Sequence, residues 1–317
     1  MTPRSLLALV RRMCTSFSAA LGAVGLACAA TPAPVTVAPG VYALMGQPGE
    51  IAPANLGRIA NVAFVVGPRG VVVVESGVSF RHGEEIIAAV GRITRKPIRL
   101  VVITHPSQEV VFGAAAFQAR GIPVWMHRSA AALMAARCGA CLRTLQAELG
   151  ERKMVGSRVV EPDRVVSKSQ SLDVIGRRLA LIAPGGGDAP GTLALLDETT
   201  GTLIAGSLVS IDRIPDLRDV DGKGWPEALA ALEATKCIHL VPAFGRIGTC
   251  ADIDALARYF TALDGHVRAL LAAGVGLAEL PARCDLAEFA AWDGYAALHV
   301  QNANRAYLRM ERDAFND

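Results

Sequence analysis

The stretch from residue 61 to residue 103 constrains the fold of this chain more than any other. β-Branched residues dominate 61–66 and 71–75, and a Gly-Pro-Arg-Gly turn separates them, which predicts two neighbouring strands. Apolar residues then recur at helical spacing over 84–93, which predicts an amphipathic helix. A third strand is predicted over 98–103, so strands and helices alternate within one packed unit.

The second half of the sequence repeats this alternation. Two β-rich halves with helices outside them predict an α+β fold, a four-layer αββα sandwich, rather than a doubly wound parallel sheet. Residues 31–317 are predicted to form one domain that ends in helices. The further strands are predicted over 159–166, 171–175, 179–182, 193–196, 203–205 and 238–241, and the further helices over 113–119, 129–150, 226–234, 251–272 and 286–312.

The composition is that of a globular protein with a large core. The chain has 317 residues, of which 52% are hydrophobic and 19% are charged. Its formal net charge is only +3, and Lys and Arg form no long run. A nucleic-acid partner is therefore not expected, because such proteins concentrate positive charge on one face.

The first thirty residues have the pattern of a secretory signal peptide. Arg4, Arg11 and Arg12 precede an apolar stretch over 19–27, and small residues follow it. The apolar stretch is shorter than the roughly 20 residues that a membrane span needs. We therefore expect 1–30 to be removed, and the rest to be periplasmic or secreted, with no stable membrane span.

Export changes how the cysteines are interpreted. Five of the seven lie beyond the signal peptide, and in an oxidising compartment they are expected to form disulfides rather than to bind metal. Cys138 and Cys141 lie three residues apart within a predicted helix and are the main candidates for a disulfide, with a redox-active pair as the alternative. Cys237 and Cys250 are a second candidate pair, and one thiol stays unpaired.

A polar loop follows the strand over 98–103. It reads THPSQEVVFG over 104–113, and the small-residue helix over 113–119 comes next. His105 and Glu109 supply an imidazole and a carboxylate, which are groups that bind metal ions, whereas Ser107 between them offers only a neutral hydroxyl. The loop therefore has the form of a metal-binding loop with exchanged ligands.

Motifs along the whole chain resemble those of the metallo-β-lactamase fold superfamily in order and spacing. Residues 137–163, residues 213–219 with Trp225, and residues 302–307 resemble an exported branch of it, the quinoprotein relay system zinc metallohydrolases, which are related to SoxH-type sulfur-oxidation proteins. The superfamily motifs correspond here to Asn61, 70–77, 96–98, Thr104-His105, Gly113, 187–191, 205–208 and 241–245.

The resemblance also implies which residues stand at the zinc-ligand positions. The first loop of the superfamily reads H-x-H-x-D-H, because histidines and an aspartate hold two zinc ions. Only the first histidine is unchanged in this chain. The corresponding residues are His105, Ser107, Glu109, Val110, Asp188, Ser207 and Phe244.

These exchanges argue against a zinc cofactor. A catalytic zinc site needs about three protein ligands and an open position for water. Hydroxyls are poor neutral ligands, and Val110 and Phe244 have no donor atom. We therefore expect a non-hydrolytic binding or accessory protein. The resemblance implies a link to periplasmic quinoprotein (PQQ) oxidation, with a small molecule or a periplasmic protein as the unidentified partner.

An enzyme remains the alternative interpretation. His105, Glu109 and Asp188 supply one nitrogen and two oxygen donors, which is the minimum for one zinc or another divalent cation. Such a site would belong to a mononuclear hydrolase of esters or thioesters. A serine hydrolase using Ser107 or Ser207 is not expected, because no G-x-S-x-G motif surrounds either residue.

Overall fold

The computed structural model describes residues 32–220 and 224–316. The predicted signal peptide over 1–30 lies outside these described residues. Within the described part of the chain, no helix combines the length and the apolar character that crossing a membrane requires.

The first sheet has seven strands in the order β1-β2-β3-β4-β5-β6-β7. Neighbours from β1 to β4 are antiparallel, and the pairs from β4 to β7 are parallel. The three strands predicted within 61–103 are all present in it. The strands are β1 (Val35–Ala38), β2 (Val41–Leu44), β3 (Val62–Gly67), β4 (Gly70–Val74), β5 (Ile98–Val102), β6 (Val124–His127) and β7 (Arg164–Val166).

The second sheet has five strands in the order β12-β11-β10-β9-β8. Only the pair β11 and β12 is parallel. The strands are β8 (Gln170–Leu172), β9 (Leu179–Ile182), β10 (Ala194–Asp197), β11 (Thr202–Ser210) and β12 (His239–Phe244).

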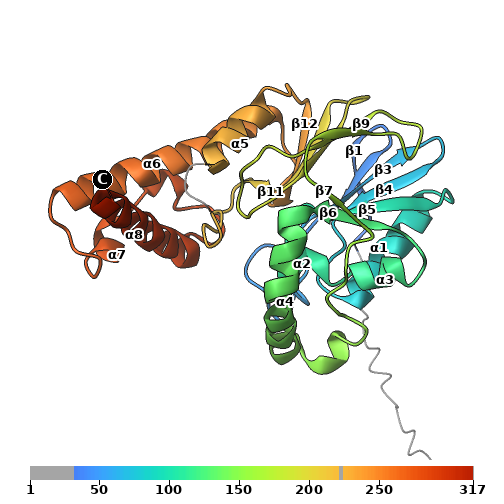
Figure 1. Ribbon diagram of the computed structural model, residues 1–317, viewed down its shortest axis with the longest axis horizontal. Coiled ribbons are helices and arrows are strands. Elements are labelled where there is room, and N and C mark those ends of the chain that lie inside the picture. Colours follow the sequence, from blue (N-terminus) through green and yellow to red (C-terminus); the bar gives the residue numbers. More distant parts are fainter. Residues whose placement is uncertain (1–31, 221–223, 317) are drawn as a thin grey trace, which may run out of the picture. The chain divides into compact units, whose positions relative to one another are not determined.

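Helices lie beside each sheet, and those at the C-terminal end reach beyond the second sheet (Figure 1). The first group contacts the seven-stranded sheet, and the second packs on β11 or on its own members. The first group is α1 (Phe80–Ile93), α2 (Gln108–Val111), α3 (Ala114–Gln118) and α4 (Arg128–Leu149). The second is α5 (Gly224–Glu233), α6 (Ile253–Ala272), α7 (Leu280–Arg283) and α8 (Val300–Asn316).

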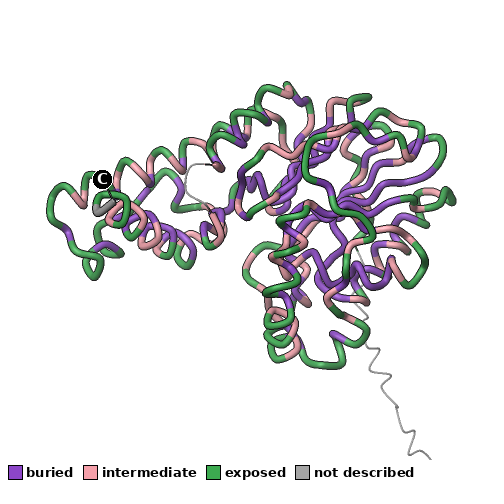
Figure 2. The backbone as a smooth tube through the Cα atoms, viewed as in Figure 1, coloured by how far each residue is buried: buried purple, intermediate pink, exposed green. Residues whose placement is uncertain are grey.

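Three hydrophobic clusters separate the four layers. Along β4, Val71 and Val73 pack with the first helices, whereas Val72 and Val74 pack in the central cluster, because alternate strand residues face opposite sides. That central cluster also contains Ile204 of β11, so it joins the two sheets. Figure 2 shows the buried segments concentrated along the strands. The predicted α+β αββα sandwich is confirmed.

Some predicted boundaries are wrong. The helix expected over 286–312 begins only at Val300, and a π-helical turn over Tyr295–His299 precedes it. Gly294, at a φ of 76°, stands directly before that turn and breaks the helical path.

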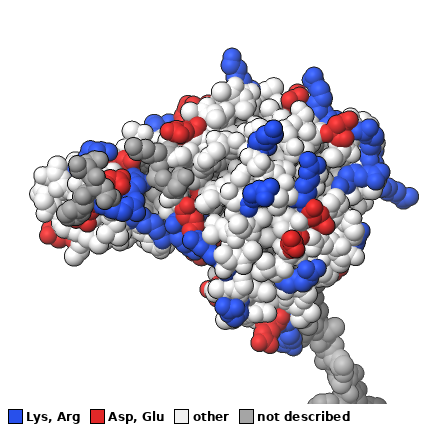
Figure 3. Space-filling model, in the orientation of Figure 1, with Lys and Arg blue, Asp and Glu red and all other residues white. Residues whose placement is uncertain are grey.

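Acidic and basic side chains are interspersed on the face drawn in Figure 3.

The cysteines pair differently from the main prediction. A disulfide joins Cys237 and Cys250, whose Cα atoms are 5.4 Å apart, so the second candidate pair is confirmed. Cys138 and Cys141 are free thiols, which corrects the disulfide expected between them. They share the continuous helix α4, and their sulfurs contact different carbonyl groups, those of Pro106 and Arg137.

Candidate functional site

A cavity of about 410 Å³ lies beside the carboxyl ends of β5, β11 and β12. The two sheets approach closely there because Gly206 of β11 has no side chain. A Cβ at Gly206, whose φ is +56°, would lie 2.1 Å from Thr104 Oγ1. Six of the seven residues predicted for the cleft line this cavity: His105, Ser107, Glu109, Asp188, Ser207 and Phe244.

Val110 is the exception among the predicted cleft residues. Its side chain is fully buried in the hydrophobic cluster between the first sheet and its helices. Its carbonyl oxygen accepts a hydrogen bond from Ser76 N at 3.1 Å. Val110 therefore anchors helix α2 and is not among the residues that line the cavity.

His105 is the most buried polar residue of the cavity, with 1% of its surface exposed. Its Nδ1 lies 2.9 Å from Thr104 Oγ1 and 3.5 Å from Glu75 Oε1. The Thr104 hydroxyl in turn donates to Glu75. Because that hydroxyl proton goes to Glu75, its oxygen is left to accept from Nδ1–H, and this arrangement fixes the orientation of the ring.

The opposite ring nitrogen of His105 has no such partner. Nε2 is buried and makes no hydrogen bond to any residue that the structure describes. Since Nδ1 is turned to Thr104 and Glu75, Nε2 is on the opposite edge of a ring that belongs to the cavity lining. A buried polar atom without a hydrogen-bond partner costs roughly 1–3 kcal/mol of stability, so a ligand atom that bonds this nitrogen would be stabilising.

The charges around His105 favour its protonated form. Burial lowers the pKa of the imidazole, but the hydrogen bond and charge of Glu75 and the charges of Asp188 and Glu109 outweigh it. The pKa of His105 therefore lies above its ordinary value. When the ring is protonated, both of its nitrogens carry a hydrogen, so Nε2 is then a hydrogen-bond donor.

Glu109 lies in the first turn of α2 and accepts a hydrogen bond from Ser107 Oγ. Burial raises the pKa of this carboxyl above its ordinary range, although the charges of His105 and Arg218 oppose the shift. Ser107, the residue before α2, makes no side-chain cap to the helix. Its hydroxyl donates to the carboxyl group of Glu109 instead.

Asp188 is also engaged by hydroxyl groups. Its Oδ1 accepts from Ser207 Oγ at 2.6 Å and from Thr192 Oγ1 at 2.8 Å. Ser207 follows Gly206 in β11, and Asp188 lies in the loop between β9 and β10 of the same sheet. The polar residues of the cavity therefore bond to one another in small groups.

This donor set does not fit the metal centre that the resemblance implies. Among the described residues, no three or more His, Cys, Asp or Glu side chains are grouped so that they could hold a metal ion. Asp188 Oδ1 and Glu109 Oε2 each accept a hydrogen bond from a serine hydroxyl, and His105 Nε2 has no partner among the described residues. These side chains are not grouped into the three-ligand site that a catalytic zinc requires.

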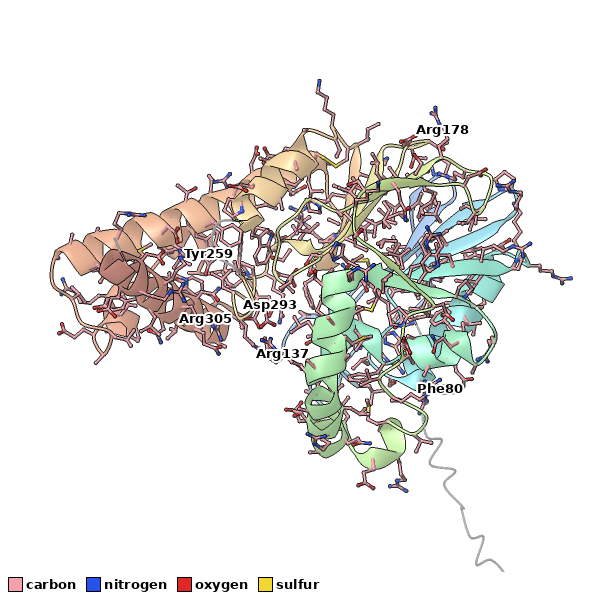
Figure 4. The ribbon with its side chains drawn as sticks, viewed as in Figure 1. Phe80, Arg137, Arg178, Tyr259, Asp293 and Arg305 are labelled. Atoms are coloured by element: carbon pink, nitrogen blue, oxygen red, sulfur yellow. A yellow bond between two sulfur atoms is a disulfide. The ribbon has the colours of Figure 1, made fainter. Side chains whose placement is uncertain are left out.

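The far wall of the cavity is aromatic and charged. The guanidinium of Arg213 lies 5.3 Å from the ring centroid of Phe244 and pairs with Glu50 and Asp293. Arg137 on α4 and Asp293 are labelled in Figure 4. Carboxylates outnumber guanidinium groups in the lining: Glu50, Glu109, Glu148, Asp188, Asp216 and Asp219 against Arg137, Arg213 and Arg218.

Two thiols belong to the α4 side of the site. Cys141 lines the cavity, whereas Cys138 is fully buried behind it. Burial raises the pKa of Cys138 to about 12, and the neighbouring Cys141 adds to the shift. The two thiols are therefore close enough to affect each other.

The sequence analysis did not identify the residues that support His105. Glu75 is 2% exposed and has a φ of 73°, which is unusual for a residue other than glycine. The available signal was a carboxylate placed directly after an entirely apolar strand. Such a residue has to find a buried partner.

The chain resembles known proteins both in sequence and in fold. The sequence model described as "Metallo-beta-lactamase superfamily" matches residues 56–244. Metallo-beta-lactamases from Pontibacter korlensis and Hirschia baltica match with TM-scores of 0.58 and 0.57, at 20% and 17% identity. Each match covers 71% of this chain, and 96% and 95% of the other chain respectively.

A further solved structure, a metallo-beta-lactamase from Erythrobacter litoralis with beta mercaptoethanol in its active site, matches with a TM-score of 0.54 at 18% identity. The match covers 71% of this chain and 94% of that one. No curated protein matches the chain. At these identities the solved structures establish the fold alone.

Proposed function

This chain belongs to the metallo-beta-lactamase superfamily, and we propose that it is a non-hydrolytic member whose cavity binds a small polar molecule through His105. The observation that carries this proposal is the buried Nε2 without a partner at the cavity wall. It supports a ligand, because buried polar atoms in proteins are nearly always hydrogen-bonded.

The exchanged ligand positions support the non-hydrolytic part of the proposal. Ser107 and Ser207 donate their hydroxyl protons to Glu109 and Asp188, so one oxygen of each carboxylate is already engaged by a protein group. Phe244 adds a ring where a ligand is expected from the resemblance, and Arg213 stacks on it. Such residues do not supply the ligands that would hold a pair of metal ions and activate a water molecule between them.

The chemistry of the wall defines the ligand. A polar atom that accepts from Nε2–H must be accompanied by apolar surface, because Phe244, Ile51 and Pro106 also line the cavity. A volume of about 410 Å³ suits a small organic molecule. A polar group with an apolar body is therefore the proposed ligand class.

Location and partners are proposed from the sequence. The N-terminal pattern of arginines, apolar residues and small residues supports export. The resemblance to the quinoprotein relay branch supports an accessory role in periplasmic quinoprotein (PQQ) oxidation. The partner is then a small molecule or a periplasmic protein of that system.

One observation favours a second candidate function, a mononuclear metal-dependent hydrolase of esters or thioesters. Histidines that bind metals commonly have their other nitrogen held by a carboxylate or another polar group. Thr104 and Glu75 hold Nδ1 of His105 in this way. Glu109 and Asp188 would then have to leave their hydroxyl partners to complete the site.

Metal analysis and native mass spectrometry separate the two functions. Protein purified without chelator is expected to contain far less than one equivalent of metal, and to retain a small molecule that His105→Ala loses. His266→Ala is the matched control, because that ring binds Arg283 O and does not line the cavity. One equivalent of metal, lost in His105→Ala and accompanied by thioester or β-lactam hydrolysis, would establish the hydrolase instead.

A further inference from the structure

Helix α4 presents two thiols of unequal access to the cavity. Its buried residues include Met134, Cys138 and Leu145, which follow one face of the helix. Cys141 lies at the edge of this face, is half-buried, and lines the cavity. A molecule inside the cavity therefore meets the Cys141 sulfur, while Cys138 lies behind it.

The position of the pair suits a bond between the two sulfurs. Residues three apart in an α-helix have Cα atoms about 5 Å apart and lie on the same side. Disulfides occur at Cα separations of roughly 4.4–6.8 Å and Cβ separations of roughly 3.5–4.5 Å. The Cβ atoms, about 5–6 Å apart at this spacing in a helix, therefore move closer when the bond forms. Cys138 Sγ lies 3.8 Å from Pro106 O, Cys141 Sγ lies 3.5 Å from Arg137 O, and the two thiols also interact with each other.

From this geometry we propose that Cys141 is a thiol-modification site inside the cavity, at which a small-molecule disulfide forms a mixed disulfide that Cys138 then resolves. The inference does not depend on the ligand of His105. Cys141 is the thiol that reacts first, because Cys141 lines the cavity. Cys138 is the resolving thiol, because Cys138 is buried next to Cys141.

The reaction is two successive thiol–disulfide exchanges. The sulfur of Cys141 attacks a disulfide RS–SR, so a Cys141–SR bond forms, the RS–SR bond breaks, and RS⁻ leaves and takes up the thiol proton. The sulfur of Cys138 then attacks Cys141 Sγ, which forms the bond between the two cysteines. The second RS⁻ leaves and takes up the Cys138 proton. Two cysteine thiols are oxidised, and one disulfide is reduced to two thiols.

The charge of the cavity selects the class of disulfide. Six carboxylates line it against three guanidinium groups and His105, so it attracts cations more than anions even when His105 is protonated. Cystamine, which carries two ammonium groups, is therefore expected to react several-fold faster than the dianionic dithiodipropionate. The difference should shrink in high salt, because salt screens these charges.

The third free thiol is an internal control. Cys284 is 3% exposed and does not line the cavity. The access argument therefore predicts that Cys284 stays unmodified under conditions in which Cys141 reacts.

The experiment treats the folded protein, with the Cys237–Cys250 disulfide intact and the other cysteines as free thiols, with cystamine and follows each cysteine by intact mass and peptide mapping. We expect a transient adduct on Cys141 that converts to a Cys138–Cys141 disulfide, a stable adduct in Cys138→Ser, and none on α4 in Cys141→Ser or Cys141→Ala. Cys284→Ser should behave as the unmodified chain does. Circular dichroism confirms that each variant is folded.

Several outcomes overturn the inference. One is that Cys138 or Cys284 is labelled before Cys141. Another is that α4 is labelled at an unchanged rate in both Cys141 variants. A third is an adduct in the unmodified chain that Cys138 never resolves. Equal or faster reaction with dithiodipropionate overturns the assigned class of disulfide. None of these results depends on metal content or on a retained ligand, so they leave the proposed function to its own test.

Discussion

Glu75 Oε1 lies 3.5 Å from His105 Nδ1, and the Thr104 hydroxyl bonds to both. Because the hydrogen bond and charge of Glu75 raise the pKa of His105 against the effect of burial, Glu75→Gln should lower that pKa. NMR titration of the histidine rings measures it. Glu84→Gln, an exposed carboxylate on α1, is the control, and an unchanged His105 titration in Glu75→Gln would contradict the arrangement.

Buried His82 should make the protein sensitive to acid. Burial, with a smaller contribution from the charge of Arg58, lowers its pKa from 6.5 to about 3. Below pH 6.5 the unfolded chain therefore binds a proton that the folded protein does not, and stability falls as the pH falls towards 3. Between pH 7 and pH 5 this histidine should cost about 2 kcal/mol of unfolding free energy.

Urea unfolding at both pH values, with and without His82→Gln, measures this contribution. The variant removes only the His82 proton, so all other titrating groups cancel in the comparison, including the ion pair of Arg58 with Glu85. Its loss of stability from pH 7 to pH 5 should be smaller than that of the unmodified chain. Equal losses would show that His82 is protonated in the folded protein.

Two neighbouring ion pairs should differ sharply in importance. Arg177 contacts Asp197 through two bonds, of 2.7 Å and 2.5 Å, and Asp197 is fully buried. Arg178 and Glu198 are 3.8 Å apart and exposed. Asp197→Ala should cost roughly 3–5 kcal/mol because it leaves a largely buried charge unpaired. Glu198→Ala should cost less than about 1 kcal/mol. Denaturant unfolding that ranks the variants equally would contradict this difference.

The fold could be predicted from the sequence because each strand or helix shows its characteristic residue pattern within one continuous segment. The alternation of Val71, Val72, Val73 and Val74 reappears as two buried faces of β4. The late start of α8 could not, because a left-handed Gly294 interrupts an otherwise helical composition. Local pattern does not show which conformation tertiary packing will impose.

The site was predictable only in part for a related reason. The resemblance to the superfamily identified His105 and Asp188 as cavity residues, but it did not show that Thr192 and Ser207 would bond Asp188. Nor did it show that Val110 packs into the core. Hydrogen-bond partners such as these depend on how a loop packs against strands that are distant in sequence, which local spacing does not show.

Adding a donor beside His105 should create a metal site. Ser107 lies between His105 and Glu109 in the loop, and its hydroxyl now bonds the carboxyl. Ser107→His removes that hydroxyl, frees Glu109 and adds an imidazole, which gives the three donors that zinc requires. Zinc affinity by calorimetry should rise at least tenfold over the unmodified chain and fall again when His105→Ala is added. Ser210→His adds an imidazole to the cavity wall away from this loop and is the control. If the unmodified chain binds zinc as tightly as the variant, the shortage of donors is not what keeps zinc out.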